Sequence, residues 1–279
     1  MMESAMANKR LQILISAVNK DPEELIGNMN LDCDAVIVNQ LIGHAQDADT
    51  AGKNCDYIQE FKDYEAMVIC RAEKGVGLSR NTALQNADHE LIQFGDDDII
   101  YDDGYVRKVI AEFDRHPEAD ILLFNVKAQE GRETYWNTDF AKVNWRNYGR
   151  YPAYAICARR QKLLDSGVRY SLLFGGGAPY MNGEDSLFLH DCLKAGLAIY
   201  RTPVAIGKER KGQSTWFKGY KDEKFFFDRG VLYHFLYGKM AMILGFRFLF
   251  INRNEMCKEL GLMHCYKLLC SGVRHGRKL

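Results

Sequence analysis

The sequence predicts an α/β fold in which a mixed, mostly parallel sheet is flanked by helices and followed by a helical C-terminal extension. Three observations support this prediction. Apolar runs of strand length alternate with helical segments over residues 1–217. Residues 218–279 carry apolar helical patterns instead. The chain of 279 residues is long enough for one α/β domain plus an extension.

The first part of the chain predicts three strands and two helices. The strands are expected at residues 11–18, 34–40 and 64–70, which are rich in branched apolar side chains. Asp21 can cap a helix in whose first turn Pro22 fits, because proline lacks only an N–H that would have no partner there. A second helix is expected over residues 80–87, with Ser79 as its N-cap.

The remainder of the domain continues the alternation. Strands are expected at residues 91–94, 119–126, 154–158 and 198–207, and helices at 105–115, 159–166 and 185–194. Gly95 ends the first of these strands, and His116-Pro117 ends the first of these helices.

Charge and cysteine usage limit the classes of function. Lys plus Arg and Asp plus Glu both number 37, so the net charge does not indicate a nucleic-acid partner. Eight cysteines are scattered without a CxxC pair, which favours a reducing cytoplasm over a disulfide framework. We expect no membrane span, because none of the apolar runs reaches the roughly 20 residues that a span requires. We therefore expect a cytoplasmic protein, peripheral at most at the inner face of the plasma membrane.

Three acidic residues, Asp96, Asp97 and Asp98, directly follow the strand expected at 91–94. Neighbouring carboxylates repel one another, which raises the pKa of at least one unless a cation lies beside them. Mg²⁺ or Mn²⁺ takes oxygen ligands and commonly bridges a carboxylate to substrate phosphates. In an open α/β sheet, ligands bind outside the carboxyl ends of the strands. The alternative is a solvated acidic loop.

Other candidate site residues have an ordinary structural reading beside the functional one. Arg80 is either a cation on a helix surface or a bidentate partner for phosphate or carboxylate. Glu184 and Asp185 either cap a helix or supply a general base. Residues 127–151 are rich in aromatic side chains that suit sugar rings, or else form a packed loop. Three glycines at 175–177 allow close approach of a ligand or movement of a lid.

Two motifs resemble those of family 2 glycosyltransferases, whose nucleotide-sugar-binding fold is called GT-A. Residues 79–84, Ala87, residues 92–94 and the acidic triplet resemble the central signature of the family. Residues 183–189, Gly-Glu-Asp-Ser-Leu-Phe-Leu, resemble its Glu-Asp motif. The resemblance covers roughly residues 10–217. Residues 213–217 resemble a segment of the family's enzymes of bacterial surface or capsular polysaccharide biosynthesis.

The resemblance implies inverting transfer of a sugar from a nucleotide-sugar, expected to be a UDP-sugar, to a hydroxyl of a glycan or lipid-linked acceptor. Asp185 is expected to be the base, with Glu184 orienting the acceptor. Mn²⁺ or Mg²⁺ is expected on Asp96 and Asp98. The expected donor contacts are Asn39, Arg71, Ser79, Arg80, Asp96 and Asp97, and the expected acceptor contacts are Trp145, Tyr151, Gly176, Gly177 and Trp216.

The sequence departs from the family pattern at two places. Asn39 stands where an aspartate often contacts the nucleotide base; an amide can read a uracil edge through its donor and acceptor atoms. No histidine follows the strand at 198–207, although many metal-dependent members have one there. Either Glu209 replaces it, or the metal relies on the triplet and the diphosphate, or Lys208, Arg210 and Lys211 take over phosphate charge.

Two other classes of function remain open at this point: a nucleotidyltransferase or nucleotide-sugar hydrolase, and a non-catalytic subunit that keeps the fold. The extension, residues 218–279, has eight Lys or Arg against two Glu from residue 239 onward, as a basic amphipathic helix at a membrane surface would have. It could equally pack on the core or in a homodimer.

Overall fold

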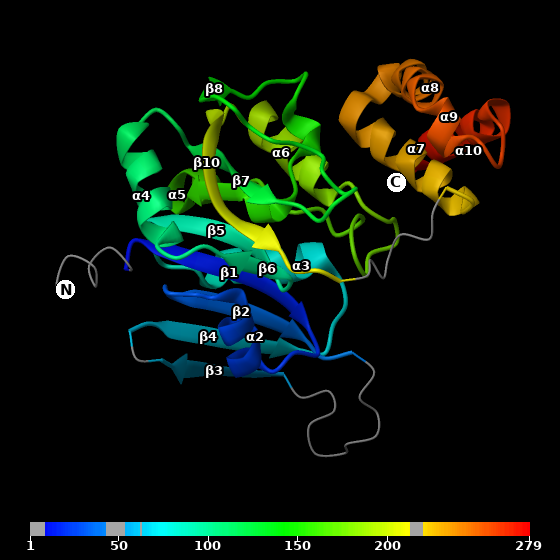
Figure 1. Cartoon of the computed structure of the whole chain (residues 1–279). Coiled ribbons are helices and arrows are strands. Elements are labelled where there is room, and N and C mark those ends of the chain that lie inside the picture. Colours follow the sequence, from blue (N-terminus) through cyan, green and yellow to red (C-terminus); the bar gives the residue numbers. More distant parts are fainter. Residues whose placement is uncertain (1–8, 43–53, 62, 213–219) are drawn as a thin grey trace.

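The structure is a computed structural model that describes residues 9–42, 54–61, 63–212 and 220–279 (Figure 1). Its centre is a ten-stranded sheet in the order β3-β4-β2-β1-β5-β9-β7-β10-β6, with β8 paired to β10. The strands are β1 (Leu11–Val18), β2 (Ala35–Gln40), β3 (Cys55–Glu60), β4 (Glu65–Arg71), β5 (Leu91–Asp96), β6 (Ile99–Tyr101), β7 (Ile121–Lys127), β8 (Ala141–Lys142), β9 (Ile156–Arg159) and β10 (Ile199–Glu209).

The sheet is mixed, as predicted. The run β4-β2-β1-β5 is parallel, and so is the pair β7-β10. The pairs β3-β4, β5-β9, β7-β9, β10-β6 and β10-β8 are antiparallel. The parallel run therefore brings the carboxyl ends of four strands to one edge of the sheet, where a ligand is expected in an open α/β fold.

Helices cover both faces of the sheet. They are α2 (Pro22–Met29), α3 (Val76–Asn86), α4 (Tyr105–Arg115), α5 (Arg160–Asp165) and α6 (Glu184–Lys194). Two short 3₁₀ turns, η1 (Tyr148–Arg150) and η2 (Ala153–Ala155), lie between β8 and β9. Apolar side chains of α2 and α4 pack on one face of the sheet. Those of α3, α5 and α6 pack on the other. Because strand side chains alternate between faces, β1 contributes Ile13 to the first core and Leu14 to the second.

Two predicted boundaries are wrong. Helix α3 begins at Val76 after Gly75, so Ser79 lies inside the helix instead of capping it. The Ser79 side chain is buried and donates to the Val38 carbonyl at 3.4 Å. The strand expected at 154–158 is divided between η2 and β9. In both places the apolar pattern of the sequence does not mark the residue at which the element begins.

The C-terminal helices form a group beside the α/β domain (Figure 1). They are α7 (Glu223–Tyr237), the 3₁₀ turn η3 (Gly238–Met240), α8 (Ala241–Ile251), α9 (Arg253–Met256) and α10 (Leu262–Gly276). These helices share their own apolar core, which includes Phe226, Leu249 and Leu269. The predicted helical extension is confirmed, while its separation from the α/β domain at residues 217 and 218 stays a prediction.

One stretch of these helices has the length and composition of a membrane span. Among the described residues, Glu223–Ile251 spans 29 residues with a mean hydropathy of 1.3 in its most apolar window, of which 17% is buried. By this measure the expectation that no segment is apolar enough is wrong. The stretch is not one continuous helix, because α7 ends at Tyr237 and the next residue, Gly238, has a φ of 51°, which breaks the helical path.

Candidate active site

The side chain of Arg80 lies at the centre of the candidate site. Its Nη1 donates to Asp185 Oδ1 and its Nη2 to Asp96 Oδ1, both at 2.8 Å. Glu184 Oε1 lies 3.6 Å from Nη1. Arg80 comes from α3, Asp96 from the carboxyl end of β5, and the other two acids from the first turn of α6. One cation thus gathers the acids of both sequence motifs into a single cluster.

Arg80 can be buried, with only 3% of its surface exposed, because its charge is compensated. A buried charge is costly unless it is paired and hydrogen-bonded. The ring of Tyr170 lies 5.0 Å from the guanidinium carbon and adds a cation–π contact. The expectation that Arg80 binds the donor stays a prediction; in this structure its hydrogen bonds go to carboxylates.

The environment of Asp185 suits a general base. Burial raises the pKa of its carboxyl to about 8, against the opposing positive charge of Arg80. Asp185 lies in the first turn of α6, where the helix dipole favours a low carboxyl pKa, but burial together with the neighbouring acids outweighs this effect. A base with a pKa close to the working pH combines sufficient ionisation with sufficient proton affinity.

The rest of the acidic triplet carries negative charge that nearby cations offset only partly. Asp97 lies 3.5 Å from Lys20 Nζ. Burial, and then the charges of Asp96, Asp97 and Glu209, raise the pKa of Asp98 to about 6. The described residues contain no group of three or more His, Cys, Asp or Glu side chains placed to hold a metal. Asp98 nevertheless fits a divalent cation that would share its coordination with a diphosphate.

Glu209, the residue that could replace the missing histidine, already has partners. Tyr154 donates its hydroxyl to Glu209 Oε1 at 2.7 Å, and the backbone N–H of Gln129 donates to Oε2 at 3.0 Å. Arg132 Nη1 lies 3.7 Å from the same oxygen. Arg210 instead binds backbone carbonyls of the acidic triplet. Its backbone N–H donates to the Asp98 carbonyl at 2.6 Å, and its Nη2 donates to the Asp97 carbonyl at 2.9 Å.

Two residues expected to contact the donor are engaged elsewhere. The amide of Asn39 exchanges both of its hydrogen bonds with the backbone of Lys20, at 2.7 and 3.1 Å. Arg71 makes a forked contact with Asp56, in which Nη2 lies 3.1 Å from Oδ2. Both stand at the carboxyl ends of parallel strands, β2 and β4, but a donor would have to displace these contacts. Their role in donor binding stays a prediction.

The expected acceptor residues are in different environments. Trp145 is 55% exposed and lies edge-on to His190, with ring centres 5.3 Å apart. Tyr151 is 2% exposed and donates its hydroxyl to Asn137 at 2.9 Å, so it packs in the core and does not face an acceptor here. Gly176 and Gly177 are exposed beside the start of α3, where the Val76 N–H donates to the Gly176 carbonyl at 2.9 Å. Trp216 lies outside the described residues.

Sequence reasoning missed two side chains that belong to the cluster. Lys20, beside Asp97, follows β1 at the same edge of the sheet. Its place just after a parallel strand could have identified it. Tyr170, over Arg80, precedes the glycine loop by a few residues and carries no such pattern.

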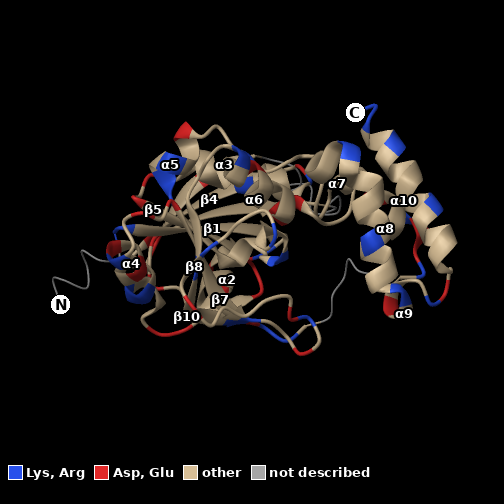
Figure 2. Cartoon of the chain, turned by 90° about the horizontal axis from the view of Figure 1, so that it is seen from above, with Lys and Arg blue, Asp and Glu red and all other residues tan. Residues whose placement is uncertain are grey.

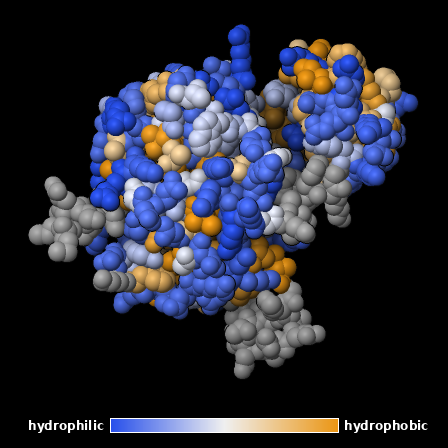
Figure 3. All heavy atoms as spheres, in the orientation of Figure 1, coloured by the Kyte–Doolittle hydropathy of each residue, from blue (hydrophilic) through white to orange (hydrophobic). Residues whose placement is uncertain are grey.

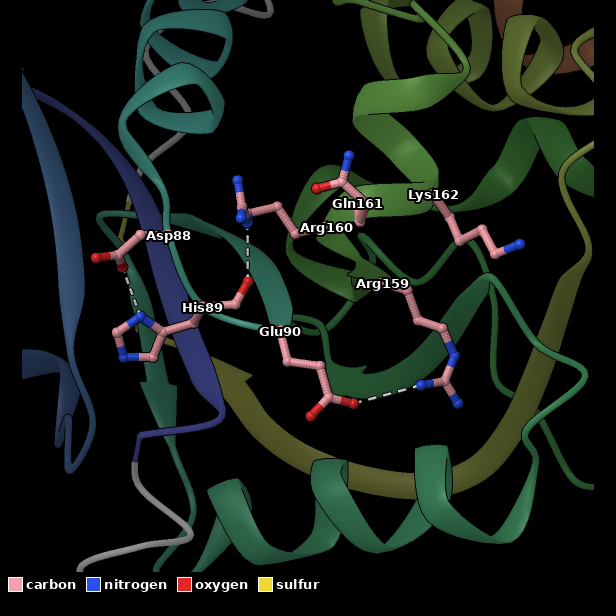
Figure 4. Close-up of a pocket in the computed structure, with 7 residues that line it drawn as sticks. All are labelled: Asp88, His89, Glu90, Arg159, Arg160, Gln161 and Lys162. Carbon is pink, nitrogen blue, oxygen red and sulfur yellow. Dashed lines mark hydrogen bonds and ion pairs between the residues drawn. The ribbon is translucent and has the colours of Figure 1, made fainter.

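A pocket of about 300 Å³ lies at the other end of β5 (Figure 4). It is lined by Asp88, His89, Glu90, Arg159, Arg160, Gln161 and Lys162. Glu90 immediately precedes β5, whereas the acidic triplet begins at its last residue. Arg159 is paired with Glu90 at 3.5 Å, and Arg160 donates to the His89 carbonyl at 2.9 Å. The pocket is therefore distinct from the Arg80 cluster.

Comparisons with known proteins agree with this architecture. Residues 48–169 match the family model described as Glycosyl transferase family 2. Residues 1–349 of TarS from S. aureus, solved in complex with UDP-GlcNAc, superpose with a TM-score of 0.54 at 14% identity, covering 97% of this chain and 73% of that chain. A further S. aureus TarS structure gives a TM-score of 0.54 at 16% identity, covering 90% of this chain and 44% of that one. No curated protein matches the sequence. The structural likeness confirms the predicted GT-A fold.

Proposed function

We propose that this chain transfers a sugar from a UDP-sugar to a hydroxyl of a glycan or lipid-linked acceptor in polysaccharide biosynthesis. The match of residues 48–169 to the model of family 2 glycosyltransferases supports this proposal. The observation that carries the proposal is the Arg80 cluster, which joins Asp96 of the donor-side motif to Asp185 of the acceptor-side motif. The UDP-GlcNAc in the TarS structure supports a UDP-sugar as donor.

The proposed reaction is a single displacement. The acceptor hydroxyl oxygen bonds to the anomeric carbon of the donor while its proton passes to the Asp185 carboxylate. The bond between that carbon and the diphosphate oxygen breaks, and UDP leaves from the opposite face, so the configuration inverts. Arg80 holds Asp185 in position through the 2.8 Å hydrogen bond. Glu184, in the same turn of α6, orients the acceptor.

The acidic triplet is the proposed binding site for the diphosphate of the nucleotide-sugar donor. Mg²⁺ or Mn²⁺ bound there would neutralise charge on the leaving diphosphate. Asp98 is the proposed main ligand: burial, and then the charges of Asp96, Asp97 and Glu209, raise the pKa of its carboxyl, and a divalent cation would stabilise its ionised form. Asp96 or Asp97 would be the second protein ligand of the metal. As a ligand, Asp96 would share its carboxylate between the metal and Arg80. Lys20 lies beside Asp97 and can contact the phosphates.

Calorimetric titration of UDP-, GDP- and CMP-sugars, with and without Mn²⁺, tests the donor site. We expect one UDP-sugar to bind in the presence of the metal. Asp98→Ala should weaken this binding about 10-fold or more, because it removes a metal ligand. Asp102→Ala, which removes a half-exposed acid paired with Lys108, is the control and should bind like the wild type. No binding by any of the nucleotide-sugars would instead favour a non-catalytic subunit.

We also infer that the C-terminal helices contact an anionic membrane surface. Helix α8 exposes one apolar stripe, with Ile243, Phe246 and Phe250 at 62%, 39% and 49% exposure. Hydrophobic residues gather on this part of the surface (Figure 3). Lys and Arg residues occur along α8 and α10 (Figure 2). Such an apolar stripe with basic neighbours binds the headgroup region of anionic bilayers.

Sedimentation with vesicles of phosphatidylserine and phosphatidylcholine tests this contact. The wild type should sediment with anionic vesicles and less with neutral ones. The double variant Ile243→Ser, Phe250→Ser should lose most of the binding, because the apolar contribution scales with buried area. Ile58→Ser, at an equally exposed site on β3, should keep it. A dimer that the double variant dissociates, with no vesicle binding by the wild type, would assign the stripe to a homodimer.

A further inference from the structure

The loop Gly175–Gly183 connects the candidate site to the C-terminal helices. It ends where α6 begins with Glu184 and Asp185. At its near end, the Gly176 carbonyl accepts from the Val76 N–H of α3 at 2.9 Å. An added Cβ on Gly177 would lie 3.0 Å from the Gly75 nitrogen, so this end lies tightly against the start of α3. The loop therefore spans the distance between the helix of Arg80 and the C-terminal group.

Helix α7 holds the far part of this loop through Asp228. The backbone N–H of Met181 donates to Asp228 Oδ2 at 2.8 Å. Lys224, one turn earlier on α7, pairs with the same carboxylate oxygen and donates to the Pro179 carbonyl at 3.0 Å. Asp228 is 2% exposed. One buried carboxylate and one lysine thus bind the backbone of the loop at two points.

Two further contacts fix the loop from α7 and α10. The hydroxyl of Tyr180 lies 2.8 Å from Nε2 of His275, on α10. Gly183 has a φ of 108°, and an added Cβ would lie 2.3 Å from the Leu232 side chain of α7. Because Gly183 is the residue before Glu184, the last position of the loop is set by direct packing against α7. A shift of α7 would therefore move the first turn of α6.

Burial of the Asp228 carboxylate lowers the stability of the fold, and its hydrogen bonds offset part of this loss. Oδ2 has two partners, while Oδ1 has no hydrogen-bond partner among the described residues. A buried carboxylate with one unsatisfied oxygen lowers stability compared with an apolar side chain of similar size. Asp228 accepts its backbone hydrogen bond from the loop that leads to Asp185, and so it fixes the position of that loop.

We propose that Asp228 is a positioning residue: through the Met181 N–H it holds the loop Gly175–Gly183, and thereby the first turn of α6, in the geometry that transfer requires. The inference rests on the proposed function for its kinetic consequence. The C-terminal helices are then part of the catalytic unit, in addition to any contact with a membrane. Donor binding, at the acidic triplet on β5, does not depend on Asp228.

The test compares two substitutions at Asp228 with a matched control. Asp228→Leu removes the acceptor, whereas Asp228→Asn keeps an oxygen for the Met181 N–H. We expect kcat for UDP release from the bound UDP-sugar to fall about 10- to 100-fold in Asp228→Leu, because small displacements of reacting groups have effects of this size. Asp228→Asn should recover most of the loss, and KM for the UDP-sugar should stay within about twofold. Leu249→Ala, buried in the same helical core, should leave kcat unchanged.

A second readout separates this inference from the proposed function. Hydrogen exchange of the backbone over residues 175–185 should quicken in Asp228→Leu and not in Leu249→Ala. Tyr180→Phe, which removes only the hydroxyl contact with His275, should show a smaller change of the same kind and serves if Asp228→Leu does not fold. Unchanged exchange and kcat in these variants would overturn the positioning role. A wild type that releases no UDP from any UDP-sugar would overturn the proposed function, whatever the exchange result.

Discussion

Arg80 shows how charge is distributed in the candidate site. One guanidinium faces Asp96, Glu184 and Asp185, so the cluster as a whole stays negative even with its cation present. Asp98 adds a further acid within the same strand end. A site with surplus negative charge is prepared for a divalent cation and poorly suited to a bare diphosphate. The metal-free protein is therefore expected to be destabilised by its own acids.

Asp98→Asn should accordingly stabilise the metal-free protein. The folded-state pKa of Asp98, about 6, lies above its ordinary value of 3.8, so the folded state binds the proton more tightly. The penalty is absent below the ordinary pKa, grows as pH rises between the two values, and is complete above the folded pKa. Removing the charge should therefore raise the free energy of unfolding by about 1–3 kcal/mol at pH 8, and by much less at pH 4.

Urea unfolding in the presence of a chelator measures this difference. The control is Asp102→Asn, whose half-exposed side chain should change stability by less than about 0.5 kcal/mol at either pH. Equal stability of Asp98→Asn and the wild type at pH 8 would show that nearby cations already compensate the triplet.

At the scale of elements, close packing of α7 against α10 holds the C-terminal helices together. An added Cβ on Gly272 would lie 1.9 Å from the Phe227 carbonyl oxygen, and one on Gly230 would lie 2.1 Å from that of Leu269. Two helix backbones can approach this closely only where side chains are absent. Polar contacts from the same pair reach the loop before α6. The glycines therefore set the distance between the helices that hold the loop.

Gly272→Ala should destabilise the C-terminal group by about 1–3 kcal/mol, because the methyl group meets backbone that cannot move aside. Gly27→Ala on α2 is the matched control, since an added Cβ there meets nothing within 4 Å. That variant should be neutral or more stable by up to about 1 kcal/mol, as alanine favours helix. Thermal unfolding of both variants measures the difference, and similar melting temperatures would contradict the close packing of α7 and α10.

For the whole molecule, the sequence predicted the elements that bury apolar runs and missed those that do not. Residues 11–18 and 91–94 alternate between two cores and were found as strands. Strand β3 has largely exposed side chains and carries no such pattern. The candidate acids and Arg80 were identified from two motifs, but the contact of Arg80 with Asp185 joins residues 105 positions apart. Local patterns do not encode such a contact, nor the burial of Tyr151 or the engagement of Asn39 by Lys20.

The most direct test of the central claim is the pH dependence of UDP release in the wild type and in Asp185→Asn, using the UDP-sugar that calorimetry identifies. Asp185 works as a base only when ionised, and its pKa is raised to about 8. The wild-type rate should therefore rise about tenfold per pH unit below this value and level off above it. Asp185→Asn should bind the donor but release UDP at least about 100-fold more slowly. An Asp185→Asn rate equal to that of the wild type would contradict the proposed mechanism.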